Sequence, residues 1–367
     1  MKRLVICFDG TWNNADNAGS ETNVARIARA IHAHAGDGLI QQVVLYLRGV
    51  GTSGLHAETV IEGAIGLGVD DNIRSGFMFL AQNYIPGDEI FLFGFSRGAF
   101  TARSLAGFVA ACGLLKRQQL GAIGKAWEYY RTDKPHDPSD FKMKTGVDTH
   151  LGVRIRFLGV WDTVGALGIP APALLPFWQS AYSFHDTGPS AVVEHGCHAL
   201  ALDEHRDEFV PTFWTGDVPA GVMIEQVWFA GVHADVGGGY RTRGLADIPL
   251  VWMAEKAEAD GLELDWSCLP DPEKLDPRAP MHESRTGVFL KDRLTPTYRR
   301  VCETNCRVTA FERLYAPHDA SNKILRTIGE SVHDSVRRRY GATAAFCVDD
   351  EAATTRLDLY KPKNFKP

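Results

Sequence analysis

Residues 88–100 read Asp88-Glu89-Ile90-Phe91-Leu92-Phe93-Gly94-Phe95-Ser96-Arg97-Gly98-Ala99-Phe100. The apolar run predicts a buried strand that passes through G-x-S-x-G into a helix. Such a turn strains the serine backbone, and side chains at Gly94 and Gly98 would collide with the neighbouring strand and helix. The pattern predicts a nucleophile elbow with Ser96 at its tip. Taken alone, G-x-S-x-G also fits a strand-to-helix turn that carries serine by chance.

Other apolar runs bounded by turn residues alternate with helical patterns. We expect strands over 3–8, 42–48, 89–94, 153–161 and 224–232, and helices over 22–34, 71–84 and 97–115. Buried strands separated by helices indicate a mostly parallel sheet with helices on both faces. Ligands bind at the carboxyl ends of such strands, so polar side chains just past residues 8, 93, 161 and 232 should converge on one crevice.

The length and composition set the domain organisation that we expect. The chain has 367 residues, of which 45% are hydrophobic and 23% charged, which suits one large α/β core with insertions. We expect a catalytic domain over 1–260, with an inserted segment around 166–220. A more polar C-terminal region over 261–367, with helices near 318–340, is expected to be appended and to pack on this core.

The segment 168–178 is apolar but is interrupted by three prolines, so a regular helix or strand is not expected there. It is either a packed loop or a cap that lines an apolar substrate cleft. In the second interpretation, the lid residues are Leu174, Leu175, Phe177 and Trp178.

Charge and cysteine content argue against several classes of function. The formal net charge of −6 offers no basic face, so we expect no nucleic-acid partner. Seven scattered cysteines suit reduced thiols in the cytoplasm. Cys302 and Cys306 form C-x3-C without a second pair or a nearby histidine, so we expect no metal and no organic cofactor.

No apolar run is long enough for a signal peptide core or a membrane span. The run over 4–8 is followed at once by Asp9, and the longest, over 104–115, has about twelve residues where about twenty are needed. We therefore expect synthesis in the cytoplasm, with any delivery made by a secretion system that needs no cleaved signal.

A serine nucleophile needs a histidine base and a carboxylate that orients the base. Asp162 and His233 each follow a predicted strand, and Ser, acid, His is the chain order of α/β-hydrolases. His205 is the rival base, but its surroundings look like a helix or helix end. Asp203 and Asp235 are the alternative acids.

The charged residues beside His205 and beside His233 can be interpreted as structural groups. Asp203 and Glu204 precede His205 and Arg206 follows it, which favours an ion-pair network over a base. Asp235 lies two residues after His233, which suits a loop-fixing group in the second layer around the site.

An oxyanion needs backbone N–H donors. One is expected from Arg97, at the start of the helix after the nucleophile, and the second from Gly10 or Thr11 after the first strand. The alternative is that Asp9 and Gly10 form only a tight turn, with Asp9 in a supporting role.

The same first loop resembles the Asp-x-Asp-Gly-Thr motif of haloacid-dehalogenase-type phosphatases. The chain reads Cys7-Phe8-Asp9-Gly10-Thr11, with Cys7 at the position of the phosphorylated aspartate, so that mechanism is lost. Gly237-Gly238-Gly239 lacks the Lys-Ser/Thr of a P-loop and is expected to let the His233 loop turn sharply.

Five ordered motifs together resemble the type VI secretion lipase effector family 1-like catalytic domain. The five motifs are Phe8-Asp9-Gly10-Thr11-Trp12-Asn13, Gly94-Phe95-Ser96-Arg97-Gly98-Ala99, Gly159-Val160-Trp161-Asp162-Thr163-Val164-Gly165, His198-Ala199-Leu200-Ala201-Leu202-Asp203-Glu204-His205-Arg206 and Gly231-Val232-His233-Ala234-Asp235-Val236-Gly237-Gly238-Gly239-Tyr240. The resemblance spans about residues 2–260, with Ser331-Val332-His333 in addition. It implies an α/β-hydrolase fold, a triad of Ser96, Asp162 and His233, and hydrolysis of phospholipid acyl esters.

The sequence thus predicts a serine hydrolase that cleaves phospholipid or fatty-acyl esters. Its expected partners are the lipid or ester substrate, a membrane surface contacted peripherally, and a secretion-machinery or immunity protein. A general carboxylesterase or lipase on soluble or polymeric esters is the alternative enzyme. A non-catalytic hydrolase-fold interaction protein is the alternative of another class, which loss of the serine, aspartate or histidine would have favoured.

Overall fold

The computed structural model describes residues 1–10, 19–36, 38–49, 61–132, 136–165, 188–304, 306–319, 321–347 and 355–367, with only the backbone described over 61–67 and at 355. Within these ranges, eight strands form a central sheet in the order β13-β9-β8-β7-β4-β1-β3-β2. They are β1 (Lys2–Phe8), β2 (His34–Ala35), β3 (Ile40–Leu47), β4 (Glu89–Phe95), β7 (Ile155–Trp161), β8 (Val193–Ala201), β9 (Met223–Phe229) and β13 (Glu330–Val332). All neighbouring pairs are parallel except β2 with β3.

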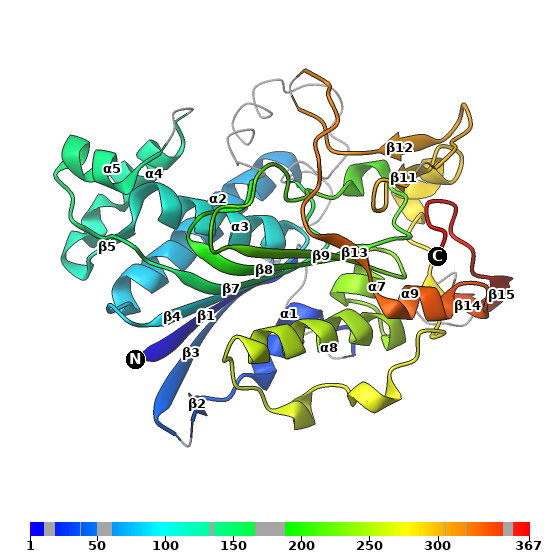
Figure 1. The fold of residues 1–367 in the computed structure, drawn as a ribbon, viewed down its shortest axis with the longest axis horizontal. Helices are drawn as coiled ribbons and strands as arrows, with labels where there is room; N and C mark the ends of the chain where they lie inside the picture. Colours follow the sequence, from blue (N-terminus) through cyan, green and yellow to red (C-terminus); the bar gives the residue numbers. More distant parts are fainter. Residues whose placement is uncertain are drawn as a thin grey trace.

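Helices cover both faces of this sheet, as the sequence predicts. Figure 1 shows α2 (Ile61–Asn83) and α3 (Arg97–Cys112) on one face, and α1 (Asn23–Ala30) and α8 (Gly244–Ala259) on the other. Strand β1 explains why both layers are needed, because Leu4, Ile6 and Phe8 enter one hydrophobic core while Val5 and Cys7 enter the other. Every residue of that strand from Leu4 onward is buried, which is typical of a parallel sheet.

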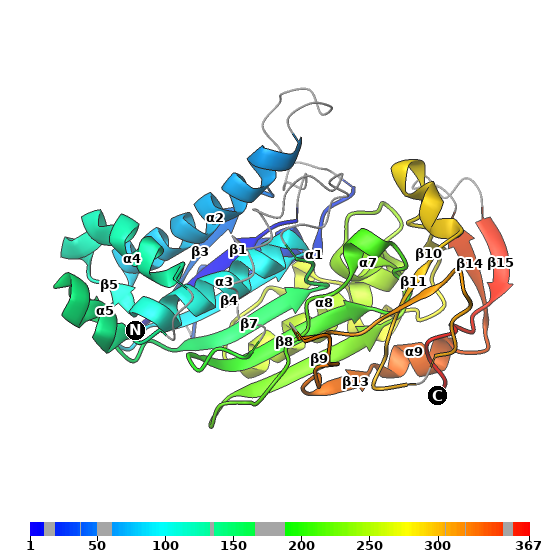
Figure 2. The ribbon, with the colours of Figure 1, turned by 90° about the horizontal axis from the view of Figure 1, so that it is seen from above.

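The strand order reverses at β1. The chain places β3 on one side of β1, and β4, β7, β8 and β9 then follow in sequence on the other side. In open α/β sheets the crevice at the carboxyl ends beside such a reversal is where ligands bind. The turns after β1 and β4 meet there, and Figure 2 shows α7 (His233–Gly237) at the same end of the sheet.

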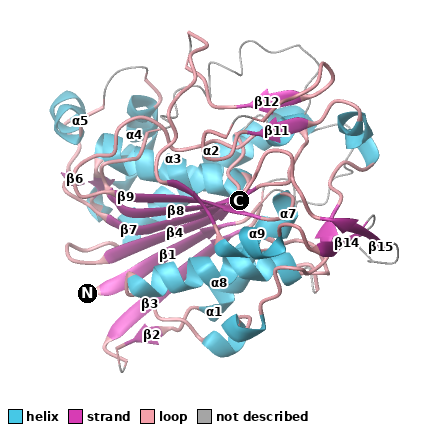
Figure 3. Ribbon diagram, turned by 45° about the vertical axis from the view of Figure 1, so that its right-hand side comes forward, coloured by secondary structure: helices cyan, strands magenta, loops and turns pink. Residues whose placement is uncertain are grey.

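Smaller elements surround this core (Figure 3). The helices α4 (Ile123–Tyr130) and α5 (Pro138–Thr145), and the short pair β5 (Leu114–Leu115) and β6 (Thr149–His150), lie beside α3. Beyond residue 260 come β10 (Met281–His282), β14 (Thr343–Cys347) and β15 (Thr355–Leu359) in one small sheet, β11 (Thr297–Arg299) and β12 (Arg313–Tyr315) in another, and α9 (Asp334–Arg339). Short 3-10 turns are η1 (Arg117–Ala122), η2 (Asp207–Phe209), η3 (Trp266–Cys268), η4 (Pro272–Lys274) and η5 (Gly287–Arg293).

Three expectations about elements need correction. The helix expected around His205 is absent, because β8 ends at Ala201 and the chain turns into a loop. Strand β8 itself lies inside 166–220, the range expected to be an insertion, and is an inner strand of the central sheet. Near 318–340 the helix is confined to α9, and β13 pairs with β9 instead.

The division of the chain at residue 260 stays a prediction, although β13 brings the later part into the central sheet. The expected lid residues Leu174, Leu175, Phe177 and Trp178 lie outside the described residues. Among the residues that are described, no helix combines the length and apolar character needed to cross a bilayer.

Candidate active site

Ser96 lies on a strained turn between β4 and α3. Its backbone has φ 57° and ψ −122°, a conformation that non-glycine residues rarely adopt. A Cβ atom on Gly94 would come within 2.4 Å of the Gly98 carbonyl oxygen, and one on Gly98 within 2.2 Å of the Phe8 carbonyl oxygen. The turn is thus wedged between β1 and α3, as the sequence predicts.

Asp162 follows the adjacent strand β7 and also has a positive φ, of 35°. Its side chain is fully buried, and its Oδ2 accepts a hydrogen bond of 2.6 Å from Nδ1 of His233. The imidazole therefore carries its proton on Nδ1 when neutral and presents Nε2 as an acceptor. The ring of Phe95, next to Ser96, lies 4.6 Å from the His233 ring between centroids, so the histidine that is bonded to Asp162 lies beside the strand end that carries Ser96.

The charges around this pair favour an ionised carboxylate and a neutral imidazole. Burial by itself raises the pKa of Asp162, but Arg299 and His233 outweigh it and lower that pKa to about 2. Burial lowers the pKa of His233, and its bond to Asp162 opposes this shift only in part. A neutral histidine beside a fixed carboxylate is the state that a general base requires.

Glu204 holds the backbone of the His233 loop, a role that the sequence did not reveal. Its carboxylate accepts the His233 N–H at 3.1 Å and pairs with the guanidinium of Arg206 at 2.8 Å. That guanidinium lies 3.5 Å above the ring of Phe209, which contacts the His233 ring at 4.9 Å. The expected ion pair of Glu204 with Arg206 is confirmed, and it supports one wall around the imidazole.

The alternative base and acids are placed elsewhere. His205 packs on Tyr298, 4.6 Å between ring centroids, and burial and Arg285 lower its pKa to about 4. Asp203 accepts the Gly231 N–H at 2.7 Å and so fixes the turn before His233.

Asp235 belongs to a second aspartate–histidine pair. Its Oδ2 accepts a hydrogen bond from the Val232 N–H at 3.2 Å, and its Oδ1 accepts one from Nδ1 of His282 at 2.6 Å. The His282 ring stacks on Tyr240 with 3.8 Å between centroids. Asp235 thus ties the His233 loop to β10, in the part of the chain after residue 260.

The loop after β1 is held by Asp9. Its Oδ1 accepts the Gly10 N–H at 2.7 Å, and its Oδ2 accepts the hydroxyls of Thr22 and Tyr46. Any oxyanion would have to compete with this carboxylate for the Gly10 amide, which favours the tight-turn interpretation for that residue. Thr11, the other expected donor, lies outside the described residues.

Residues 2–256 match the family described as the type VI secretion system phospholipase effector Tle1-like catalytic domain. This chain belongs to that family. The match confirms the resemblance found in the motifs, and it includes Ser96, Asp162 and His233.

The relatives of this Tle1-like chain have low sequence identity to it, and the matches cover only part of each protein. An uncharacterized protein of Saccharomyces cerevisiae, YEL023C, is 30% identical over 232 residues, which are 57% of this chain and 32% of the yeast protein. A solved structure of an uncharacterized protein from Pseudomonas aeruginosa has 20% identity and a TM-score of 0.41 over 74% of this chain and 48% of that one. The Tle1 effector bound to the VgrG spike of the type 6 secretion system has 23% identity and a TM-score of 0.36, over 65% and 51%. This chain spans about a third of the yeast protein and about half of each solved chain.

One contact to Asp162 in this Tle1-like chain comes from beyond the matched range. Arg299, at the end of β11, is 1% exposed and donates to both carboxylate oxygens of Asp162, at 2.6 and 3.0 Å. No periodic pattern marks this arginine in the sequence, because β11 has three residues and its partner is 137 positions away.

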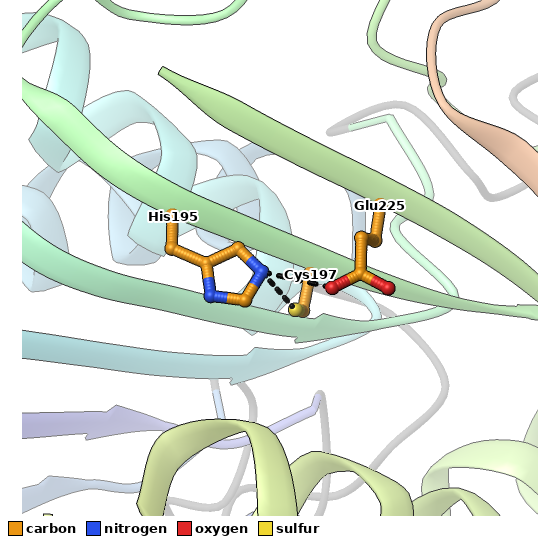
Figure 4. A group of neighbouring side chains, drawn as sticks. All are labelled: His195, Cys197 and Glu225. Atoms are coloured by element: carbon orange, nitrogen blue, oxygen red, sulfur yellow. Dashed lines mark hydrogen bonds and ion pairs between the residues drawn. The ribbon is translucent and has the colours of Figure 1, made fainter. Parts of the chain in front are cut away.

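His195, Cys197 and Glu225 are the described side chains best spaced to hold a cation (Figure 4). Nε2 of His195 lies 3.3 Å from the Cys197 sulfur and 3.0 Å from a Glu225 oxygen, close to the edges of a tetrahedral zinc site. However, Lys256 already donates to both Glu225 oxygens, at 2.7 and 2.8 Å, and so supplies the positive charge that an ion would bring. The group lies at the opposite ends of β8 and β9 from the candidate site and is satisfied as an ion-pair network.

Proposed function

We propose that the chain is a serine hydrolase of the α/β-hydrolase fold that cleaves carboxylic esters, with phospholipid or fatty-acyl esters as the substrate class. The proposal rests above all on the bond between His233 and Asp162 beside the strained turn of Ser96. Membership of a family of phospholipase effector catalytic domains supports the lipid substrate.

In this mechanism Ser96 Oγ attacks the acyl carbon while His233 Nε2 takes the hydroxyl proton. The imidazolium is stabilised by Asp162, which already accepts Nδ1–H, and then gives the proton to the departing alcohol. A water molecule attacks the acyl-serine ester in the second half of the cycle, again with His233 as base, and releases the fatty acid. No metal or organic cofactor takes part in these steps.

The oxyanion is proposed to bind at the start of α3. The backbone amide of Arg97 is the first of that helix, where the helix dipole favours negative charge. Thr11 is the proposed second donor, since the Gly10 amide is engaged by Asp9.

The family description also names the type VI secretion system, and we propose delivery by such a machine after synthesis in the cytoplasm. A secretion-machinery protein, an immunity protein and peripheral contact with a membrane surface are the corresponding proposed partners. A lid over the cleft at 169–178 belongs to the same proposal.

A fluorophosphonate probe tests the central claim. We expect covalent labelling at Ser96, because an activated serine beside oxyanion donors reacts with such electrophiles and ordinary serines do not. Labelling should vanish in Ser96→Ala and persist in Ser104→Ala, a control on the same helix. If folded wild-type protein stays unlabelled under conditions that label a known serine esterase, the enzyme proposal is wrong.

A panel of p-nitrophenyl esters of increasing chain length, run beside phospholipid vesicles, separates the lipid substrate from the general carboxylesterase alternative. A lipolytic enzyme should gain kcat/KM with chain length, since each buried methylene contributes about 0.8 kcal/mol. Equal rates on short and long esters would favour the carboxylesterase.

A further inference from the structure

The guanidinium of Arg299 donates four hydrogen bonds, three of them buried and the fourth, to Phe209, partly buried. Besides the two carboxylate oxygens of Asp162, its guanidinium donates to the carbonyls of Ala201, at 2.6 Å, and Phe209. These carbonyls belong to the end of β8 and to η2, so one side chain joins β11 to the segment that carries Glu204.

Only a planar fork with several donors can make this set of contacts. A guanidinium has five N–H groups in one plane and binds a carboxylate with two parallel bonds, whereas an ammonium acts as a point charge. The Asp162 carboxylate is therefore held in one orientation, with Oδ2 shared between Arg299 and His233.

The positive charge of Arg299 also bears on the proton affinity of His233. The charged groups that act directly on that imidazole are Asp162 after β7 and Glu204 and Arg206 after β8. Arg299 on β11 acts through its contacts with Asp162, and Asp235, on the same helix as His233, is paired with His282. Because Arg299 neutralises much of the field of Asp162, the imidazolium gains less from its partner than in an aspartate–histidine pair without a cation.

We propose that Arg299 is a positioning residue of the triad, which orients Asp162 and keeps His233 unprotonated in acidic medium. This inference rests on the proposed function and extends it beyond residue 256, where the family match ends. It implies an enzyme whose rate holds to lower pH than an ordinary histidine, with its pKa near 6.5, would allow.

The test compares kcat/KM against pH for wild type, Arg299→Met and Arg299→Lys on a short soluble ester. Removing the charge of Arg299 should raise the apparent pKa on the acid side of the kcat/KM profile by about one unit. The His233 imidazolium then faces an Asp162 carboxylate whose charge is no longer compensated. Arg299→Lys keeps the charge but loses the fork, so its limb should move by less than about 0.3 unit while kcat falls about tenfold. Arg299→Gln replaces Arg299→Met if the latter does not fold.

Arg339→Met is the matched control. Arg339 is also fully buried and donates to two carbonyls, of Pro277 and Ala279, both at 2.7 Å. Its loss should lower the melting temperature without moving the acid limb. An equal limb shift in Arg339→Met, or an unmoved limb in the neutral Arg299 variants, would overturn the proposal.

A titration of the His233 imidazole by NMR, in the Ser96→Ala background, separates this inference from the proposed function. The midpoint should rise in the neutral Arg299 variants whether or not the protein hydrolyses esters. A shifted midpoint with inactive wild-type protein would refute the hydrolase and retain the role of Arg299. An unshifted midpoint with active protein would refute the role of Arg299 and retain the hydrolase.

Discussion

Residues 2–256 and residues 261–367 build the candidate site in different ways. In the first part, continuous apolar strands carry Ser96, Asp162 and His233 to one end of the sheet. In the second part, strands of two or three residues bring His282 and Arg299 against carboxylates of the first. Regular elements thus place the proposed catalytic groups, and short strands and turns hold them through polar contacts.

The two aspartate–histidine pairs give the sharpest test of this difference. Asp162 with His233 and Asp235 with His282 have the same 2.6 Å separation, but only His233 lies beside Ser96. We expect His233→Ala to lower kcat by about a thousandfold or more, because triad members act as a unit. His282→Ala should lower kcat less than about tenfold and reduce mainly the melting temperature. Steady-state kinetics on a soluble ester measure both.

His205→Ala is the control for the alternative base and should also cost little in kcat. Comparable losses in folded His233→Ala and His205→Ala proteins would contradict the assignment of the base.

A smaller difference is expected between two glutamates that bind arginine in the same local way. Glu204 with Arg206 and Glu283 with Arg285 each combine a backbone N–H and a bidentate guanidinium. Only Glu204 also accepts the His233 amide. Glu204→Gln should lower kcat about tenfold or more, since a charged hydrogen bond is worth about 1.5–3 kcal/mol.

Glu283→Gln is its counterpart in the second part of the chain. The Glu283 side chain is 26% exposed, and pairs near the surface contribute little, so kcat should change less than about twofold. Equal effects of the two substitutions would show that the second part matters to the loop as much as the first.

The smallest effect concerns Asp203, which receives the Tyr360 hydroxyl from the second part at 2.9 Å and the Gly231 amide from the first. Burial raises the pKa of Asp203 to about 6. The folded state therefore holds this proton more tightly than the unfolded state, and stability is lost as pH rises from about 4 to 6. Asp203→Asn keeps an acceptor oxygen, so its melting temperature should exceed that of wild type by a few degrees at pH 7.5 and by little at pH 4.

Asp358→Asn is the control, because that carboxylate is 48% exposed and its substitution should change the melting temperature little. A lower melting temperature for Asp203→Asn at pH 7.5 would mean that the hydrogen bonds need the charge.

The sequence predicted those parts of the structure that are determined by residues close together in the chain. Apolar runs and the glycines at 94 and 98 were enough for the sheet, the elbow and the strand ends that carry Asp162 and His233. Strand β8 was missed because histidines interrupt its apolar pattern. Buried His198 is tolerated there because its Nε2 accepts the Thr163 N–H at 3.0 Å, a partner 35 positions away.

Arg299 and the bond from the His233 amide to Glu204 escaped prediction for the same physical reason. Their roles depend on which distant atoms they meet, and neither periodicity nor composition carries that information. A buried arginine in an irregular segment looks in the sequence like any solvated one.

The two positive-φ turns have a consequence for how the family can diversify. The Ser96 N–H donates to the Trp161 carbonyl at 3.0 Å, and the Asp162 N–H to the Ala199 carbonyl at 2.7 Å, so each turn continues the ladder one residue past its strand. The separation of Ser96 from Asp162 is then set by the interstrand repeat of about 4.8 Å and not by any loop. We infer that related chains can lengthen, shorten or exchange the loops at this edge of the sheet. The separation of Ser96 from Asp162 would stay the same, because the sheet fixes it.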